Sequence, residues 1–111
     1  MNKSIILIFL LSFSILNANI NKEDIAKNQK NVFETYCWGC HHQTSMAFGP
    51  SFQEIANKRT IAEIKGHIIS PKSTYKLFGY KRSVMPSFAN ILTDEQLDLI
   101  ANYIKSYKGK K

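Results

Sequence analysis

The 111-residue chain has few of the residues that cross-link small proteins or bend them sharply, with two cysteines, three prolines and five glycines. The cysteines, Cys37 and Cys40, lie three positions apart, so a disulfide between them would close a very short loop and add little stability. A fold held by several disulfides is therefore excluded. Acidic side chains are also scarce, at eight Asp and Glu against fifteen Lys and Arg, which gives a net charge of +7.

Long apolar runs are absent as well. The longest, residues 5–16, is well short of the roughly 20 residues that a membrane-spanning helix needs. It follows Lys3 and precedes the small residue Ala18, an order typical of a secretory signal peptide. We therefore expect residues 1–18 to be a cleaved signal peptide and residues 19–111 to form one domain, with no stable membrane insertion after cleavage. A retained anchor is the alternative.

Export and charge together limit the partners. We expect an exported, periplasmic bacterial protein, and export argues against binding to nucleic acid. Loss of residues 1–18 removes only one basic side chain, so the mature net charge is +6. The remaining fourteen basic residues are spread along the chain, and they include Lys58, Arg59, Lys72, Lys76, Lys81 and Arg82. This basic surface is either ordinary solvated surface or a surface that steers the protein towards acidic docking faces on redox partners.

The remaining pattern is helical, and no segment alternates as a strand would, which predicts an all-α fold. The first helix is expected to begin near Asn21 and to run into Cys37. Its inward face is predicted from the spacing of five residues: Ile25, Gln29, Val32, Phe33 and Tyr36. Two short helices should follow, begun by capping boxes at Ser51–Glu54 and Thr60–Glu63.

The last helix is expected to begin at Thr93, with Gln96 completing a capping box and Gly109 ending it. Its buried stripe is predicted to be Leu97, Ile100, Ala101 and Ile104. Residues 71–92 show no regular pattern, and an irregular connection of that length is often functional. This segment contains Met85.

One motif indicates specific chemistry: Cys37-Trp38-Gly39-Cys40-His41 is C-x-x-C-H, the attachment sequence of c-type haem. Two thiols at this spacing can add to the two vinyl groups of one porphyrin, and the following imidazole can reach the iron. A covalently bound haem would also complete the core of a chain this short. A thioredoxin-like pair would need a βαβ context, which is absent. A zinc site completed by His42 or His67 is a further alternative.

In this order of motifs the chain resembles the class I cytochromes c, most closely the small bacterial c551/c553-type monohaem carriers. The resemblance spans Ile25 to Tyr107 and includes Gly49-Pro50, Met85-Pro86 and the helix with Tyr103. It implies a small cytochrome c fold of about four helices around one haem, with the N- and C-terminal helices packed together. It also implies a monomeric electron-transfer protein and not an enzyme.

Residue by residue, the resemblance implies that Cys37 and Cys40 form two thioethers to haem c. His41 would bind the iron through Nε2 and donate from Nδ1–H to the Pro50 carbonyl, and Met85 would be the second iron ligand. The terminal helices would meet at Phe33 and Tyr103. The chain departs from the family at Gln29, where a small glycine is common.

Other polar and sulfur-bearing residues were weighed as ligands. We expect His42 to lie at the surface, His67 to be exposed on the side of its helix opposite the isoleucines, and Met46 to pack in the interior. Trp38 is expected either to be partly exposed beside the haem or to pack. The candidates for contact with a haem propionate are Tyr75, Tyr80, Lys81 and Arg82.

Three functions fit this pattern to different degrees. The first is a diffusible periplasmic single-electron carrier. The second is a fixed cytochrome c subunit of a larger periplasmic redox complex, such as a dehydrogenase or a sulfur-oxidising assembly. The third is a haem enzyme or gas sensor with an open iron site, which is disfavoured because the sequence supplies no acid–base pair for it.

Overall fold

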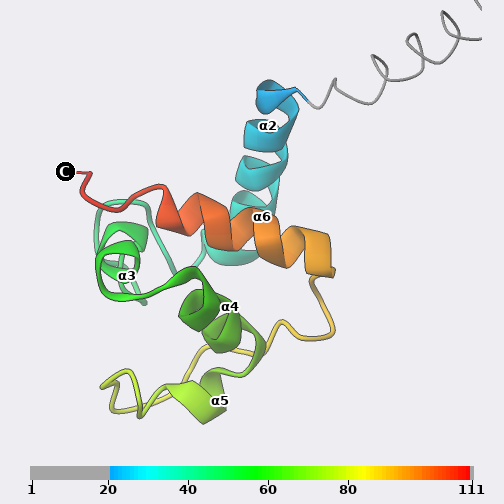
Figure 1. Ribbon diagram of the computed structural model, residues 1–111. Coiled ribbons are helices and arrows are strands. Elements are labelled where there is room, and N and C mark those ends of the chain that lie inside the picture. Colours follow the sequence, from blue (N-terminus) through cyan, green and yellow to red (C-terminus); the bar gives the residue numbers. More distant parts are fainter. Residues whose placement is uncertain (1–20, 111) are drawn as a thin grey trace, which may run out of the picture.

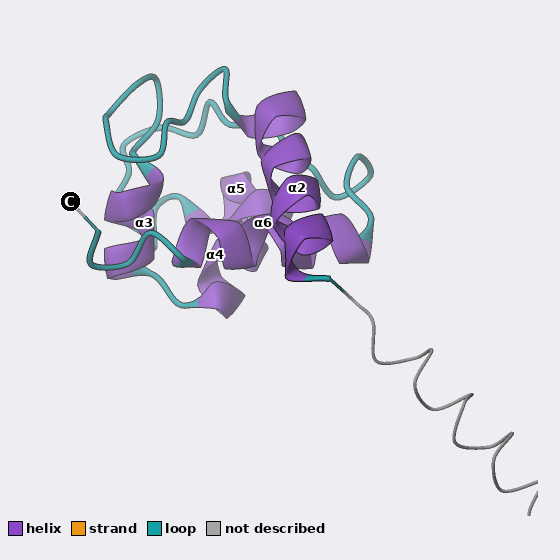
Figure 2. Cartoon of the chain, turned by 90° about the horizontal axis from the view of Figure 1, so that it is seen from above, coloured by secondary structure: helices purple, strands orange, loops and turns teal. Residues whose placement is uncertain are grey.

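The computed structural model describes residues 21–110, and every regular element within that range is helical (Figure 2). The elements are α2 (Lys22–Val32), a π-helical turn η1 (Phe33–Cys37), α3 (Phe52–Lys58), α4 (Ile61–Ile69), α5 (Pro71–Thr74) and α6 (Asp94–Lys105). The predicted all-α fold is confirmed. The expected signal peptide, residues 1–18, lies outside the described residues. Within the described range, no helix is both long enough and apolar enough to cross a membrane.

Two of the predicted capping boxes are complete. Thr60 Oγ1 accepts from the Glu63 N–H (3.2 Å), and Glu63 Oε1 accepts from the Thr60 N–H (3.0 Å). Thr93 and Gln96 make the same pair of bonds at 3.1 and 3.0 Å. Each box satisfies two backbone N–H groups that the first helical turn leaves without partners, which fixes where α4 and α6 begin.

The capping box expected at Ser51 has only one of its two hydrogen bonds. Ser51 Oγ accepts from the Glu54 N–H (3.1 Å), but the Glu54 carboxylate accepts from Lys58 Nζ at 2.8 Å. An oppositely charged partner one helical turn away therefore competes successfully with the backbone donor.

Residues 71–92 are more ordered than the sequence suggests. Pro71 occupies the first turn of α5, where its missing N–H costs nothing. Further along, the segment returns to the end of α4. The Phe88 N–H donates to the Ile68 carbonyl (3.0 Å), and the Ser87 hydroxyl donates to the Ile69 carbonyl.

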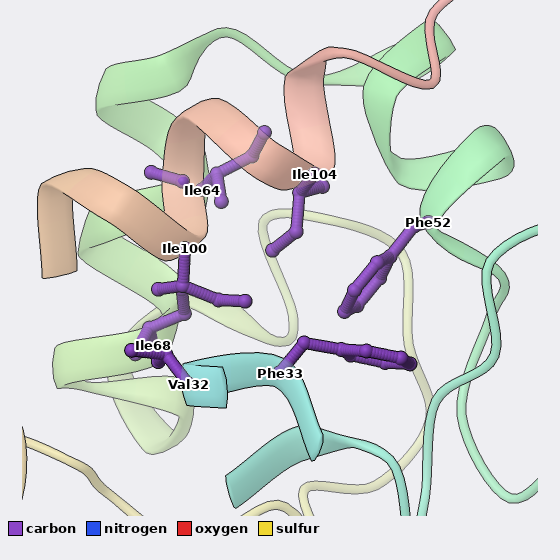
Figure 3. Close-up of a cluster of buried hydrophobic side chains, with 8 residues drawn as sticks. Val32, Phe33, Phe52, Ile64, Ile68, Ile100 and Ile104 are labelled. Atoms are coloured by element: carbon purple, nitrogen blue, oxygen red, sulfur yellow. The ribbon is translucent and has the colours of Figure 1, made fainter. Parts of the chain in front are cut away.

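Helix α6 is the element on which the others assemble, because it packs against α2, α3 and α4 (Figure 1). The core at these crossings comprises Val32, Phe33, Phe52, Ile64, Ile68, Ile100, Ala101 and Ile104 (Figure 3). The Phe33 and Tyr103 rings lie 5.5 Å apart between centroids, which confirms that the terminal helices meet there.

The predicted inward face of the first helix is only partly correct. Val32 and Phe33 are buried, but Ile25 is 39% exposed. Figure 1 shows the reason: α6 crosses the C-terminal part of the first helix, and the N-terminal turns of α2 extend beyond the core. Gln29, the departure from the family pattern, is half-buried near the edge of the contact.

A single lysine ties α6 to the end of α3. Lys105 Nζ donates to the carbonyls of Ala56 (2.8 Å) and Arg59 (2.6 Å). These carbonyls lie at the C-terminal end of α3, where a cation also interacts favourably with the helix dipole. The contact therefore fixes the backbone of Arg59, a residue that matters for the site described below.

Candidate functional site

A cavity of about 290 Å³, partly open to solvent, lies between the helices and the segment 71–92. Its walls are mainly aromatic and aliphatic side chains. The five site residues selected from the sequence all line it: Cys37, Cys40, His41, Pro50 and Met85. The fold thus gathers around one apolar space residues that are up to 48 positions apart in the chain.

The cysteines reach the cavity through an unusual helix end. The Trp38 N–H donates to the Phe33 carbonyl (2.9 Å), a bond across five residues that makes the last turn a π-helix. Wide turns of this kind are frequent at functional sites. The Cys40 and His41 N–H groups then both donate to the Cys37 carbonyl, at 3.1 and 2.9 Å. This tight turn places both cysteines and the histidine on one wall.

Burial raises the pKa of the Cys37 thiol to about 11, so this group is a neutral thiol at neutral pH. Within residues 21–110 no group of three or more His, Cys, Asp or Glu side chains is arranged to hold a metal ion. The geometry therefore gives no support to a zinc site. A thiol suits thioether formation, in which the sulfur and its hydrogen add across a vinyl double bond.

His41 is held in the tautomer that a metal ligand requires. Its Nδ1 lies 2.8 Å from the Pro50 carbonyl oxygen, which accepts only, so Nδ1 carries the proton. The Nε2 lone pair is therefore free, as sequence analysis anticipated. Burial lowers the pKa of His41, the bond to Pro50 raises it, and the neighbouring His42 lowers it further. The net direction is downwards, which favours the neutral imidazole.

Gly49 fits closely against the His41 ring. A Cβ atom at this position would lie 2.4 Å from His41 Cε1 and 2.8 Å from Nδ1. The ring also stacks on Phe52, with centroids 5.8 Å apart and an angle of 26° between the planes. The Gly49 N–H donates to the Cys40 carbonyl (2.8 Å). His41 is thus in contact with a residue that must be small and with a buried aromatic ring.

Met85 lines the same cavity and is half-buried. It comes from the far side of the sequence, in the segment that Ser87 and Phe88 attach to the end of α4. The cavity therefore has a nitrogen donor from the N-terminal half of the chain and a thioether sulfur from the C-terminal half.

Two rival ligands do not line the cavity. Met46 was expected to pack, but it is 78% exposed, so that prediction is wrong. It lies in the loop between η1 and α3. His42 is half-buried and stacks on Trp38 with centroids 5.7 Å apart. Trp38 itself is 56% exposed, in agreement with the expectation of partial exposure and not with the alternative of packing.

The prediction for His67 is also wrong. The ring is half-buried and lines the cavity. Its Nδ1 is 2.6 Å from Thr74 Oγ1, and it lies against the rings of Phe78 (5.3 Å) and Tyr80 (6.1 Å). Apolar spacing identified the buried residues Ile64 and Ile68 correctly. Both belong to the core and also line the cavity, and His67 lines the cavity with them.

Burial lowers the pKa of His67, and the nearby charges of His41 and Arg59 lower it further. His67 is therefore predominantly neutral at pH 7. His67 is thus a second histidine on the cavity wall, beside His41, and the sequence offered no local signal for it.

Arg59 is a second residue that sequence analysis missed, because it was counted only as part of the basic surface. Its guanidinium lies over the Phe78 ring, 4.0 Å from the centroid, and its Nη2 donates to the Phe78 carbonyl (2.9 Å). The Nε–H is buried without a partner, as is the Ser83 hydroxyl. Both residues line the cavity.

Two unused buried donors in one cavity indicate that it takes a ligand with an acceptor group, since such donors are rarely left unpaired. A haem fits this requirement, because it is largely apolar and carries two carboxylates. Among the propionate candidates chosen from the sequence, Tyr75, Tyr80 and Arg82 line the cavity, whereas Lys81 does not.

Comparison with protein families gives one match: the family model described as Cytochrome c covers residues 26–108. No curated protein and no solved structure matches the chain. The matched span begins within α2 and ends beyond α6, so it includes the cavity and all the residues that line it.

Replacement of Gly49 by alanine should disturb His41 directly. The added Cβ must push the ring away and break its bond to Pro50, which should lower the free energy of unfolding of the haem-loaded protein by about 1–3 kcal/mol. Guanidinium denaturation measures this. The matched control is Gly39→Ala, within the C-x-x-C-H motif, where a Cβ meets nothing within 4 Å. Equal, small shifts of the two midpoints would show that the contact at Gly49 does not constrain the ring.

Proposed function

Because the chain belongs to the cytochrome c family, which attaches haem c covalently and transfers electrons, we propose that it is a periplasmic single-electron carrier with iron ligated by His41 and Met85. The haem, when bound, supplies one-electron chemistry between ferric and ferrous iron. The small domain suits one haem, joined by thioethers to Cys37 and Cys40.

The observation that carries this proposal is the tautomer of His41. Its Nδ1–H is committed to Pro50, so the Nε2 lone pair is available to the iron in a fixed direction. Met85 lines the same cavity and offers a soft sulfur, which favours the ferrous state and raises the reduction potential. With both axial positions taken by the protein, no site is open to a substrate. We therefore assign an electron carrier and not an enzyme.

Arg59 has a distinct role in this proposal. Its Nε–H is a strong donor, buried without a partner within the described chain, and the residue lines the cavity. A haem propionate is the acceptor that the cofactor supplies, and charge-assisted bonds of this type are among the strongest in proteins. Tyr75, Tyr80 and Arg82 are further candidates for contact with the same carboxylates.

The proposed partners are redox proteins with acidic docking faces. The segment 71–92, which forms part of the cavity wall, has four exposed basic side chains and no acidic residue: Lys72, Lys76, Lys81 and Arg82. Charge of one sign beside a redox centre increases the rate of encounter with an oppositely charged protein. A diffusible carrier of this kind would be monomeric, and the export signal expected at residues 1–18 would deliver it to the periplasm.

A second candidate is a fixed subunit of a larger periplasmic redox complex. One observation favours it: Leu77 is 82% exposed, next to the cavity-lining Phe78. An apolar side chain in this position suits permanent burial against a partner. The same iron ligands serve both functions, so the two candidates differ only in what covers this surface.

The ligation by Met85 is tested by the absorption spectrum of the oxidised protein. Methionine sulfur on ferric haem gives a weak far-red band, which should be present in the wild type and lost entirely in Met85→Ala. Met46→Ala is the matched control, because its exposed side chain lies outside the cavity, and it should keep the band. A wild-type spectrum without the band would contradict ligation by Met85 and favour an open-site enzyme or sensor.

The role of Arg59 is tested by the pH dependence of the reduction potential. In the wild type the propionate should stay ionised, so the potential should change little between about pH 5 and pH 8. In Arg59→Gln the propionate pKa should rise. Protonation at low pH then removes a negative charge that stabilises ferric iron, so the potential should fall as the pH rises, by up to about 59 mV per pH unit.

Lys58→Gln provides the control for Arg59→Gln. It removes the same charge from the adjacent residue, whose amine is exposed and pairs with Glu54. Its potential should follow the wild-type profile. A flat profile in Arg59→Gln would show that Arg59 serves the fold alone.

A further inference from the structure

His67 is next to the residues that hold the segment of Met85 in place. The Phe88 N–H and the Ser87 hydroxyl hold the segment that follows Met85 against the carbonyls of Ile68 and Ile69. His67 immediately precedes these two residues on α4, and both His67 and Met85 line the cavity. The segment carrying the thioether is therefore docked onto the end of the helix that carries the imidazole.

The tautomer of His67 follows from its hydrogen bonds. The single Thr74 hydroxyl hydrogen is donated to the Ser70 carbonyl (3.1 Å). With the hydrogen directed there, Thr74 Oγ1 accepts from His67 Nδ1–H, at 2.6 Å. The neutral ring consequently has its lone pair on Nε2, for which the described chain provides no hydrogen-bond partner. His41 is in the same state, with Pro50 in place of Thr74.

The two donors differ in how firmly the chain holds them. His67 stands on the regular helix α4, and its ring lies against Phe78 and Tyr80. Met85 belongs to the stretch 81–86, which makes no backbone hydrogen bond in the described structure. Segments without such bonds open at the lowest free-energy cost. The methionine is therefore the donor that leaves its position more readily, and the histidine is carried by a regular helix at the cavity wall.

We propose that His67 is a reserve iron ligand, whose Nε2 takes the sixth coordination position when the Met85 sulfur leaves it. The inference rests on the proposed ligation by His41 and Met85. In the exchange the iron–sulfur bond breaks and an iron–nitrogen bond forms. No electron is transferred, and no proton is released, because Nε2 already has its lone pair.

The direction of the exchange follows from the chemistry of the donors. Ferric iron is the harder ion and prefers imidazole nitrogen, whereas ferrous iron prefers the soft thioether. Ligation by two histidines also lowers the reduction potential relative to His/Met ligation. The exchange would hold the iron oxidised and closed to small ligands, so a chain that has lost Met85 would neither accept electrons from its usual donor nor bind gases.

The test uses haem-loaded variants in the oxidised state at neutral pH, with spin state read from absorption and electron paramagnetic resonance spectra. Met85→Ala should be six-coordinate and low-spin with the signature of two imidazoles. The double variant Met85→Ala with His67→Gln should lose that signature and become high-spin. The control, Met85→Ala with His42→Gln, should keep it, because His42 does not line the cavity.

Three results would overturn the proposal: a high-spin Met85→Ala, a double variant with His67→Gln that remains low-spin, or loss of the signature in the His42 control. The thioethers keep the cofactor in every variant, so haem loss does not confuse the comparison. The wild-type far-red band tests Met85 alone and these variants test His67 alone, so the two assignments can fail separately.

A second measurement avoids the double variant. Dilute guanidinium, below the unfolding transition, should displace Met85 from the wild type and remove the far-red band while the iron stays low-spin. His67→Gln retains Met85 and should start from the same spectrum, but loss of its band should be accompanied by a high-spin signal. Identical behaviour of the two proteins would contradict the proposal.

Discussion

The packing of one large apolar cofactor into the cavity beside α3, α4 and the segment 71–92 is the constraint on which the rest of the structure depends. The side chains on α6 and its neighbours fill only one part of the interior, and a cavity of about 290 Å³ adjoins them. A chain this short buries too small a fraction of its surface to tolerate such a space unfilled. The proposed covalent attachment at Cys37 and Cys40 would make the haem a permanent part of the core.

The chain's own contribution to function is to fix donor atoms around that cofactor. Pro50 and Gly49 orient His41 from one side, and the Thr74 hydroxyl does the same for His67. Each histidine has its Nδ1–H committed and its Nε2 lone pair free. Lys105 holds the backbone of Arg59 by a bond to its carbonyl, which places a buried donor at the cavity wall. Local hydrogen bonds thus set the chemistry of a site whose walls are mainly apolar.

The sequence predicted most of the framework because its signals are local. Capping boxes fixed the starts of α4 and α6, and helical spacing identified the buried stripe of α6, including Ile100 and Ile104. The C-x-x-C-H motif located one wall of the cavity. Spacing fails where burial depends on distant elements. It shows which residues share a helix face, but it does not show how much of the helix is covered, as for Ile25, or whether a second face is covered too, as for His67. The role proposed for Arg59 was not predicted, because it follows from the burial of its Nε–H without a partner. Only the three-dimensional structure shows such a donor.

The central claim, that the haem completes the core, is tested most directly by thermal unfolding of the chain with Cys37→Ser and Cys40→Ser, prepared without haem and followed by circular dichroism. The account predicts no cooperative transition, because the cavity is left unfilled and the helices have too little surface to bury. The haem-loaded wild type should unfold in a single cooperative step. A cooperative, native-like transition in the haem-free chain would contradict the account, because it would show that the helices fold without the cofactor.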